Sequence, residues 1–323
     1  MSASGTRITA PTWESAEEDR GRYLLDRPGL LGPVMLLPAV IYIFALVGIP
    51  LVMALLYSLS DVTVGDQSID WVGLENFRAV WRDATFQTAL RNSIAFTLIS
   101  QIIVIVLANV LVMVLSADFP GKRLVRFLVM LPWTTPLVLA VIGWRWMLDN
   151  IYSPLDAILR ELNLLGPGTR FGPLKNMKWL SNDELAQGAV IAVHVWRTLP
   201  FAAIILLAGL TAIPKDINDA ADVDGAGFWR QLVFIRIPLL LPIMAVAILY
   251  GITFTFTDII VVYVLTLGGP VNATQVLPYW AYFKGIGGGG DLAQGAAIAL
   301  FLFPVLVAVA ILMLRIARRS ETT

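Results

Sequence analysis

Arg145, His194, Arg197 and Asp258 lie inside strongly apolar stretches of this 323-residue sequence, and the last three are candidates for chemistry. His194 is the only histidine, Arg197 follows about one helical turn later, and Asp258 lies in a separate apolar stretch. An ionisable group at membrane depth is costly unless water or a partner relieves it, so such residues are functional candidates by default. Their chemistry suits either the coupling of an ion or hydrogen bonding to a polar solute.

Two sets of residues are predicted to share helix faces. His194, Thr198 and Phe201 follow an i, i+4, i+7 spacing. The second set is Gly251, Phe254, Thr255 and Asp258. Such groups suit a sugar, whose hydroxyls need donors and acceptors and whose C–H faces pack on aromatic rings. The alternative is structural: the polar groups satisfy one another between packed helices, with threonine bonding to its own helix and Arg197 pairing with Asp258.

The composition predicts that the elements carrying these residues lie in a membrane. Hydrophobic residues make up 58% of the chain, charged residues 14%, and the mean hydropathy is +0.77. A soluble globular protein has about 25% charged residues. The net charge of zero argues against a nucleic-acid partner. The absence of cysteine excludes disulfides, thiolate metal sites and a cysteine nucleophile.

Six apolar runs are long enough to cross the bilayer, which takes about 20 residues per helix. They predict an all-α polytopic protein, with spans at residues 29–60, 92–117, 127–148, 185–212, 237–264 and 292–314. An even number of spans places both termini on one side. Thirteen of the 23 lysines and arginines fall in segments on that side and eight in segments on the other, so both ends are predicted to be cytoplasmic.

The segments between the spans differ in character. Residues 70–92 alternate charged and apolar positions at near-helical spacing, which predicts an amphipathic helix on the outer membrane surface. Residues 149–184 are predicted to form an outer loop with a short helix around 154–164. The glycine-rich residues 285–291 predict a flexible connection before the last span.

The longest cytoplasmic loop, residues 214–238, contains many acidic and small residues. Pro214 suits a helix start, Asp219 lies near its positive end, and Gly225 suits a left-handed end. A second short helix, about 226–236, is expected to end before Pro238. The loop would then form a compact knob with small residues on one face and three aromatic side chains available for insertion elsewhere: Phe228, Trp229 and Phe234. The alternative is an ordinary loop whose bulky side chains touch the membrane surface.

This loop carries a motif that resembles the EAA loop of the inner-membrane permeases of binding-protein-dependent ABC importers. The matching positions are Asp219, Ala220, Ala221, Asp224, Gly225 and Ala226, followed by Phe234 and Pro238. Asp219 stands where that family most often has glutamate. Further stretches are similar to the carbohydrate branch of these permeases, which includes maltose and glycerol-3-phosphate importers: 71–77 (WVGLENF), 131–136 (LPWTTP), 195–201 (VWRTLPF), 209–217 (GLTAIPKDI) and 265–270 (LTLGGP).

The resemblance implies a type I ABC importer permease fold in the cytoplasmic (inner) membrane. It extends from about residue 30 to 317 and implies a transmembrane domain over 29–317, between a cytoplasmic segment 1–28 and a tail 318–323. The 214–238 loop would be the coupling helix that docks in an ATPase, through the motif residues and Phe228. The chain has no P-loop pattern, so it is expected to be non-catalytic and to bind no cofactor of its own, with ATP and Mg²⁺ bound by the ATPases.

The implied partners are a second homologous permease, two ATP-binding subunits, an extracytoplasmic sugar-binding (lipo)protein and membrane lipid. The implied solute is a carbohydrate, a disaccharide such as trehalose. Sugar-contacting positions carried over by the resemblance fall on Trp133, His194, Thr198, Phe201, Gly251, Phe254, Thr255 and Asp258. Arg197 is a weaker candidate for closing a gate.

Two other classes of protein fit parts of the pattern. An ion-coupled secondary sugar transporter would use Asp258 and His194 as coupling groups, but such transporters typically carry inverted repeats, which are not visible here. A membrane enzyme is disfavoured by a single histidine, the absence of cysteine and the absence of an HExxH motif.

Overall fold

The computed structural model describes residues 28–171 and 176–321, which are mostly helical and contain no β-strand apart from one isolated bridge between Ser60 and Trp71. The chain divides into two compact units, Met1–Leu56 and Tyr57–Thr323. All functional candidates lie in the second unit. The proposed domain limits at residues 28 and 317 remain a prediction.

The described part of the first unit belongs to one long apolar helix. It consists of α1 (Pro28–Ile43), the π-turn η3 (Phe44–Gly48) and α2 (Ile49–Ser58), whose last residues belong to the second unit. The stretch Leu31–Ser58 is long and apolar enough to span a bilayer, and none of its most apolar window is buried within the chain. This confirms the predicted first span as a helix whose apolar surface needs lipid or another protein.

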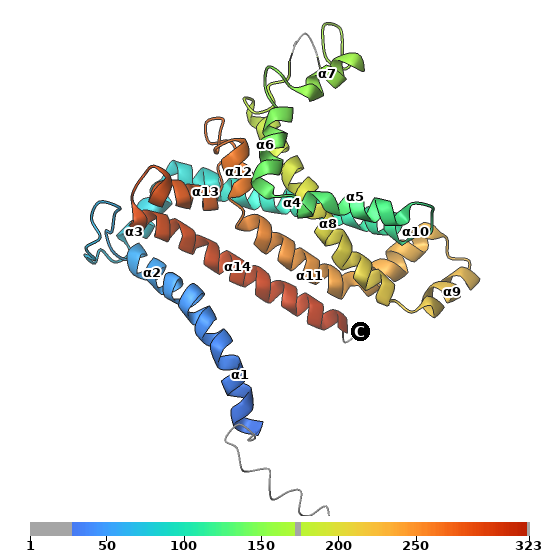
Figure 1. The fold of residues 1–323 in the computed structure, drawn as a ribbon, viewed down its shortest axis with the longest axis horizontal. Helices are drawn as coiled ribbons and strands as arrows, with labels where there is room; N and C mark the ends of the chain where they lie inside the picture. The colour runs from blue at the N-terminus through green and yellow to red at the C-terminus, as the bar shows by residue number, and fades with distance from the viewer. Residues whose placement is uncertain (1–27, 172–175, 322–323) are drawn as a thin grey trace, which may run out of the picture. The chain divides into compact units, whose positions relative to one another are not determined.

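The second unit is built around a helix bundle (Figure 1). Its N-terminal half consists of α3 (Glu75–Arg82), α4 (Ala84–Ser116), α5 (Lys122–Thr134), α6 (Leu137–Met147), α7 (Pro154–Glu161) and α8 (Asp183–Ala212). Its C-terminal half consists of α9 (Lys215–Val223), α10 (Phe228–Gln231), η4 (Leu232–Arg236), α11 (Ile237–Phe256), α12 (Ile260–Leu265), α13 (Leu277–Tyr282), η5 (Phe283–Gly287) and α14 (Leu292–Glu321).

Helix α4 packs against both α8 and α11. Helix α11 also contacts α8 and α14, and α5 packs on α8. A core of small and branched residues joins α4, α8 and α11: Val104, Ala108, Val112, Val195, Ala202, Ala203, Leu206 and Ala247. Small side chains let these helix backbones approach closely, which is the usual packing inside a membrane.

Side-chain caps fix where the two long helices begin. The carboxylate of Asp83 accepts a hydrogen bond from the Thr85 backbone N–H at 2.7 Å, so α4 begins eight residues before the apolar run. The side-chain oxygen of Asn182 accepts from the Leu185 backbone N–H at 3.0 Å at the start of α8. Helix α3 and the first turns of α4 confirm the helical part of the amphipathic prediction for 70–92, and α7 confirms the short helix near 154–164.

The third span was predicted as one continuous helix over 127–148, and this is wrong. Helices α5 and α6 meet at an angle of 94° across Thr135 and Pro136. Pro136 lacks a backbone N–H, and its ring pushes Thr135 into an extended conformation with ψ of 137°. The helix therefore breaks in the middle of the apolar run.

The fifth span also differs from its prediction. Helix α11 ends at Phe256, and residues 257–259 separate it from α12, so Asp258 lies beyond the helix end rather than on its face. At the other end, α10 and η4 run into α11 as one span, Trp229–Phe256. The expected stop before Pro238 is therefore wrong, because the helix continues past this proline through the π-turn η4, in which the Ile237 N–H donates to the Leu232 carbonyl.

Five described helices are long and apolar enough to cross a membrane, and the bent α5–α6 pair makes a sixth candidate. The chain is thus an all-α membrane protein. The cytoplasmic position of its termini remains a prediction.

Candidate functional site

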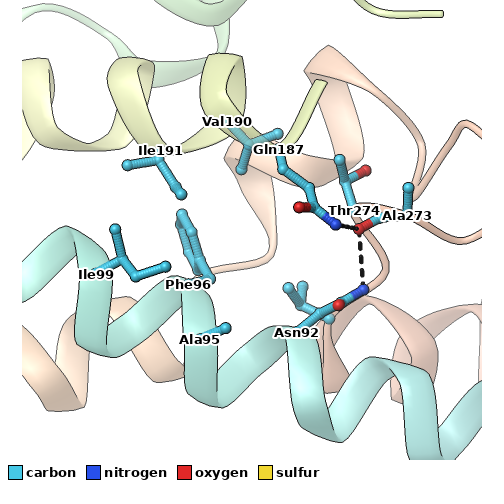
Figure 2. Close-up of a pocket in the computed structure, with 10 residues that line it drawn as sticks. Asn92, Ala95, Phe96, Ile99, Gln187, Val190, Ile191, Ala273 and Thr274 are labelled. Atoms are coloured by element: carbon cyan, nitrogen blue, oxygen red, sulfur yellow. Dashed lines mark hydrogen bonds between the residues drawn. The ribbon is translucent and has the colours of Figure 1, made fainter. Parts of the chain in front are cut away.

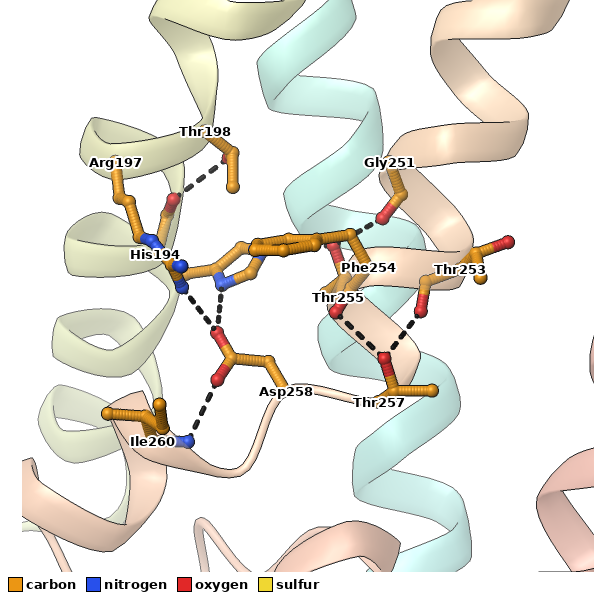
Figure 3. Close-up of polar contacts among 10 residues, drawn as sticks. All are labelled: His194, Arg197, Thr198, Gly251, Thr253, Phe254, Thr255, Thr257, Asp258 and Ile260. Carbon is orange, nitrogen blue, oxygen red and sulfur yellow. Dashed lines mark hydrogen bonds and ion pairs between the residues drawn. The ribbon is translucent and has the colours of Figure 1, made fainter. Parts of the chain in front are cut away.

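Three ionisable residues of the apolar stretches, His194, Arg197 and Asp258, meet at one point (Figure 3). Nη1 of Arg197 lies 3.2 Å from Oδ2 of Asp258 and donates a hydrogen bond to it. Nδ1 of His194 lies 3.2 Å from the same oxygen, at ion-pair distance but without hydrogen-bond geometry. The other carboxylate oxygen accepts from the Ile260 backbone N–H at 2.8 Å. The predicted pairing of Arg197 with Asp258 is confirmed, and this polar cluster joins α8 to the break after α11.

The imidazole of His194 is completely buried and contacts α11 through its second nitrogen. Nε2 lies 2.9 Å from Oγ1 of Thr255, whose hydroxyl donates to the Gly251 carbonyl at 2.7 Å. Since that hydroxyl proton is already used, Nε2 is the donor to Thr255.

Beside the polar cluster lies an aromatic cluster made of residues from α5, α8 and α11. The rings of Trp133 and Phe201 stack with centroids 4.6 Å apart, and Phe201 lies 4.6 Å from Tyr250. Phe254 contacts both Trp133 and Tyr250, and the guanidinium carbon of Arg197 lies 4.7 Å from its ring centroid. Arg197 thus connects the aromatic cluster to the polar cluster, with a cation–π contact on one side and an ion pair on the other.

A small space between these helices is lined by aromatic, small and amide side chains. It is lined by Gln101, Val104, Trp133, Thr198, Phe201, Ala202, Ala247, Tyr250, Gly251 and Phe254. Its volume is about 10 Å³, which is room for about one water molecule, whereas small-molecule sites measure about 300 Å³ or more. This space is therefore too small to hold a sugar in this conformation.

The structure brings together five of the eight predicted pathway residues around this space: Trp133, Thr198, Phe201, Gly251 and Phe254. The remaining three, His194, Thr255 and Asp258, belong to the adjoining polar cluster. The sequence analysis missed Gln101 and Tyr250. Tyr250 precedes Phe254 by four residues, and that helical spacing was the available signal. No three histidine, aspartate or glutamate residues within the described ranges gather closely enough to hold a metal ion.

The loop after α12 is fastened to the bundle by two side-chain amides (Figure 2). Asn92 of α4 donates to the Ala273 carbonyl at 3.0 Å, and Gln187 of α8 donates to the same oxygen at 2.8 Å. The side chain of Val271 in this loop is 94% exposed. Two helices thus hold the loop in place while its tip stays exposed.

The 214–238 loop folds as a helix with a glycine end. Helix α9 ends in a Schellman motif, in which the Ala226 N–H donates to the Ala221 carbonyl and the Gly225 N–H to the Asp222 carbonyl. Gly225 has φ of +69°, which an L side chain rarely adopts, so the predicted left-handed end is confirmed. The side chain of Gln231 donates to Asp222 and to the Ala226 carbonyl and thereby fastens α9 to the next helix.

The motif side chains of this loop face two ways. Asp219, Ala220, Asp224 and Gly225 are exposed, Ala226 is half-buried, and Ala221 is buried against the loop. Phe234 of η4 and Val223 of α9 are 74% and 87% exposed. The side chain of Phe228 lies outside the described residues. The loop thus presents carboxylates and apolar groups outward on a short, fixed helix.

Residues 110–322 match the model of a protein family described as the binding-protein-dependent transport system inner membrane component. The match covers the bundle from the last two turns of α4 onward, including the 214–238 loop. The chain belongs to this family. It is an inner-membrane permease of the ABC transporter type, and such permeases are non-catalytic membrane subunits.

Relatives of this permease align over most of its length. The trehalose transport system permease of Mycobacterium tuberculosis is 31% identical, over 88% of this chain and 87% of that protein. The trehalose/maltose transport system permease of Thermococcus litoralis is 29% identical, over 90% and 95%. A chain of a bacterial ABC transporter involved in the import of the acidic polysaccharide alginate has the same fold, with a TM-score of 0.75 at 19% identity over 95% and 98%.

Proposed function

We propose that this permease forms one half of the transmembrane pathway of an ATP-driven carbohydrate importer, and that its solute is a disaccharide such as trehalose. The observation that carries the proposal is the aromatic-lined space beside the buried polar cluster, in a member of a family with trehalose and maltose permeases among its relatives. Aromatic rings pack on the C–H faces of a sugar, and amide and hydroxyl groups bond its hydroxyls.

The charges around the space support a neutral sugar. Arg197 is the cation nearest the aromatic rings, and the carboxylate of Asp258 compensates it within the same cluster. The lining residues themselves carry no formal charge. An acidic sugar would meet no free cation among them, in contrast to the acidic polysaccharide imported by the transporter of similar fold.

The partners follow from the family and from the geometry. One bundle with a space of about 10 Å³ encloses no solute, so a second permease is needed to complete the pathway. An external sugar-binding protein delivers the solute, as the family description implies. Two ATP-binding subunits supply the energy, and the exposed face of α9 is the surface on which one of them docks.

ATP must change the balance between two conformations of the permease. A ligand that binds both states equally shifts nothing, so the ATP-bound subunits must favour one of them. The Schellman end and the Gln231 bonds make the 214–238 loop a rigid body that continues into the span ending at Phe256. Movement of the ATP-binding subunits can therefore reach Gly251 and Phe254 through one helix.

An ion-coupled secondary transporter remains the rival function. Its coupling groups would be His194 and Asp258, which are in contact. Membership of a binding-protein-dependent family supports the ATP-driven importer instead. Uptake that follows a proton or sodium gradient and needs no ATP would favour the rival.

The test is sugar-stimulated ATP hydrolysis by the assembled importer in nanodiscs, with its binding protein and a panel of disaccharides. Wild type is compared with Gly225→Asp, which places bulk and charge at the left-handed end of α9. The matched control is Gly121→Asp, because Gly121 also has a positive φ (+84°) and no atom within 4 Å of an added Cβ. We expect stimulation by one sugar in wild type and in the control, and loss of assembly or stimulation in Gly225→Asp.

Stimulation that survives in Gly225→Asp would reject the docking surface. A wild-type complex that hydrolyses ATP without response to any sugar would reject the carbohydrate assignment.

A further inference from the structure

Helix α4 carries polar groups that the sequence analysis did not assign to any role. Oγ1 of Thr97, Oγ of Ser100 and Nε2 of Gln101 are buried and have no hydrogen-bond partner among the described residues. By contrast, Asn109 on the same helix donates to the Ile105 carbonyl at 2.8 Å. An unpaired polar group in an apolar interior is costly, so these groups favour a partner from outside the described residues, such as water or a solute.

Gln101 is the one of these three that lines the aromatic space. Its side chain is 6% exposed, and its amide lies where a Cβ on Gly251 would be. Glycine at 251 is therefore what allows α4 to bring an amide against α11. The same space is bounded by the rings of Trp133, Phe201 and Phe254.

The geometry points to Gln101 as a solute-binding residue that determines specificity. We infer that Nε2 of Gln101 donates a hydrogen bond to one hydroxyl oxygen of the carbohydrate when the aromatic rings separate to admit it. This rests on the proposed function and adds α4 to the three helices already expected to contact the solute. In the closed conformation the same N–H has no partner, and the space beside it holds about one water molecule.

A polar solute gains from this arrangement in a way that an apolar one does not. The rings supply contact with C–H faces in any orientation, whereas a single amide at a fixed place distinguishes one hydroxyl from the others. A site built to bond a hydroxyl rejects an analogue that lacks it, because its own buried donor is then left unpaired. Gln101 is thus expected to determine which sugars are transported, according to the positions of their hydroxyl groups.

The test uses the complete importer in proteoliposomes with its loaded binding protein at saturation. Uptake is measured for trehalose and maltose and, for the sugar that wild type transports, for its set of monodeoxy derivatives. Gln101→Leu removes the donor at nearly constant volume, and Gln101→Asn tests whether a shorter amide restores uptake. Asn109→Leu is the matched control, since that amide is bonded within its own helix.

We expect Gln101→Leu to lower the maximal uptake of the full sugar about 5- to 10-fold, the value of one hydrogen bond. One monodeoxy derivative should be transported by wild type at a similarly reduced rate, and Gln101→Leu should no longer distinguish it from the full sugar. The binding protein also discriminates among the sugars. Because the same binding protein is used with variant and wild type, its discrimination cancels when the two are compared.

Two results would overturn the inference while the proposed function stands. Either Gln101→Leu transports at the wild-type rate, or it is slower but still discriminates every monodeoxy sugar as wild type does, which is the behaviour of a merely structural residue. If Gln101→Leu fails to assemble, Gln101→Asn and Gln101→Met carry the same comparison. Failure of wild type to take up any sugar would reject the proposed function itself.

Discussion

The carboxylates of the polar cluster at the end of α11 and those of the 214–238 loop differ in burial and in bonding. The side chain of Asp258 is 5% exposed and lies within 3.2 Å of two nitrogen-containing side chains of the same chain. Asp219 and Asp224 are exposed, and no hydrogen bond or ion pair joins their side chains to the described residues. The first region therefore completes its contacts within the chain, whereas the second leaves its carboxylates exposed, as docking on the proposed ATP-binding subunit requires.

Because of this difference, substitutions in the two regions should affect different properties: the stability of the fold in one, and coupling to a partner protein in the other. Substitutions in the polar cluster should lower the free energy of unfolding, because they leave buried groups without partners. Substitutions on the exposed face of α9 should leave that free energy unchanged and impair only communication with a partner.

The largest effect is expected for Asp258→Asn. It leaves the guanidinium of Arg197 beside a neutral side chain, and removal of one partner of a buried ion pair costs about 3–5 kcal/mol. The measurement is unfolding of the purified permease in mixed micelles. The double variant Arg197→Met with Asp258→Asn should be more stable than Asp258→Asn alone. Equal stability of the two would show that the pair does not hold these segments together.

A smaller loss, about 1–3 kcal/mol, is expected for Gly251→Ala. The added methyl would overlap the amide of Gln101, so α4 and α11 must move apart. Combining it with Gln101→Ala should recover much of the loss, because the two residues share one space and their effects are then not additive. Additive losses would contradict the close approach of these helices.

Gln231→Leu is expected to have an effect on stability between those of substitutions in the two regions. Gln231 is buried and fastens α9 through Asp222 and the Ala226 carbonyl. Its loss should cost about 1 kcal/mol locally. Hydrogen exchange at the α9 amides should become faster while α8 and α11 keep their protection. Faster exchange throughout the bundle would mean that the loop is not a separate unit.

The sequence was sufficient for features that depend on local composition. Apolar run length predicted the spans, and the Gly225 end of α9 followed from its preference for positive φ. Features that depend on a break in a helix were not predictable from local composition. Run length does not register the bend at Pro136, and it placed Asp258 on a helix that ends two residues earlier.

The candidate site was predictable only where its residues lie on one helix. Thr198 and Phe201 were found from their spacing, whereas the pairing of Arg197 with Asp258 was one of two open alternatives until both helices were placed. Gln101 was missed because its role depends on the glycine opposite to it on α11, 150 residues further along the chain. Contacts between distant segments leave no periodic signal in one sequence.

The smallest effect on stability, and the sharpest test of the comparison, is expected for Asp219→Ala. Asp219 and Val223 lie one turn apart on the exposed face of α9, and Ala221 packs on the opposite side. Removing an exposed carboxylate should change the free energy of unfolding by less than about 0.5 kcal/mol. Binding-protein-stimulated ATP hydrolysis of the assembled importer should nevertheless fall, because this carboxylate faces the proposed partner.

The matched control is Asp118→Ala, an exposed carboxylate in the connection from α4 to α5. A hydrogen bond from Lys122 holds the pKa of Asp118 below its ordinary value, so this control carboxylate is charged at neutral pH. If only Asp219→Ala loses stimulation, the docking surface is specific to α9. If both variants lose it equally, the requirement is for negative charge on this side of the molecule in general. Loss of stability in Asp219→Ala would instead mean that the loop, like the polar cluster, has its partners within the chain.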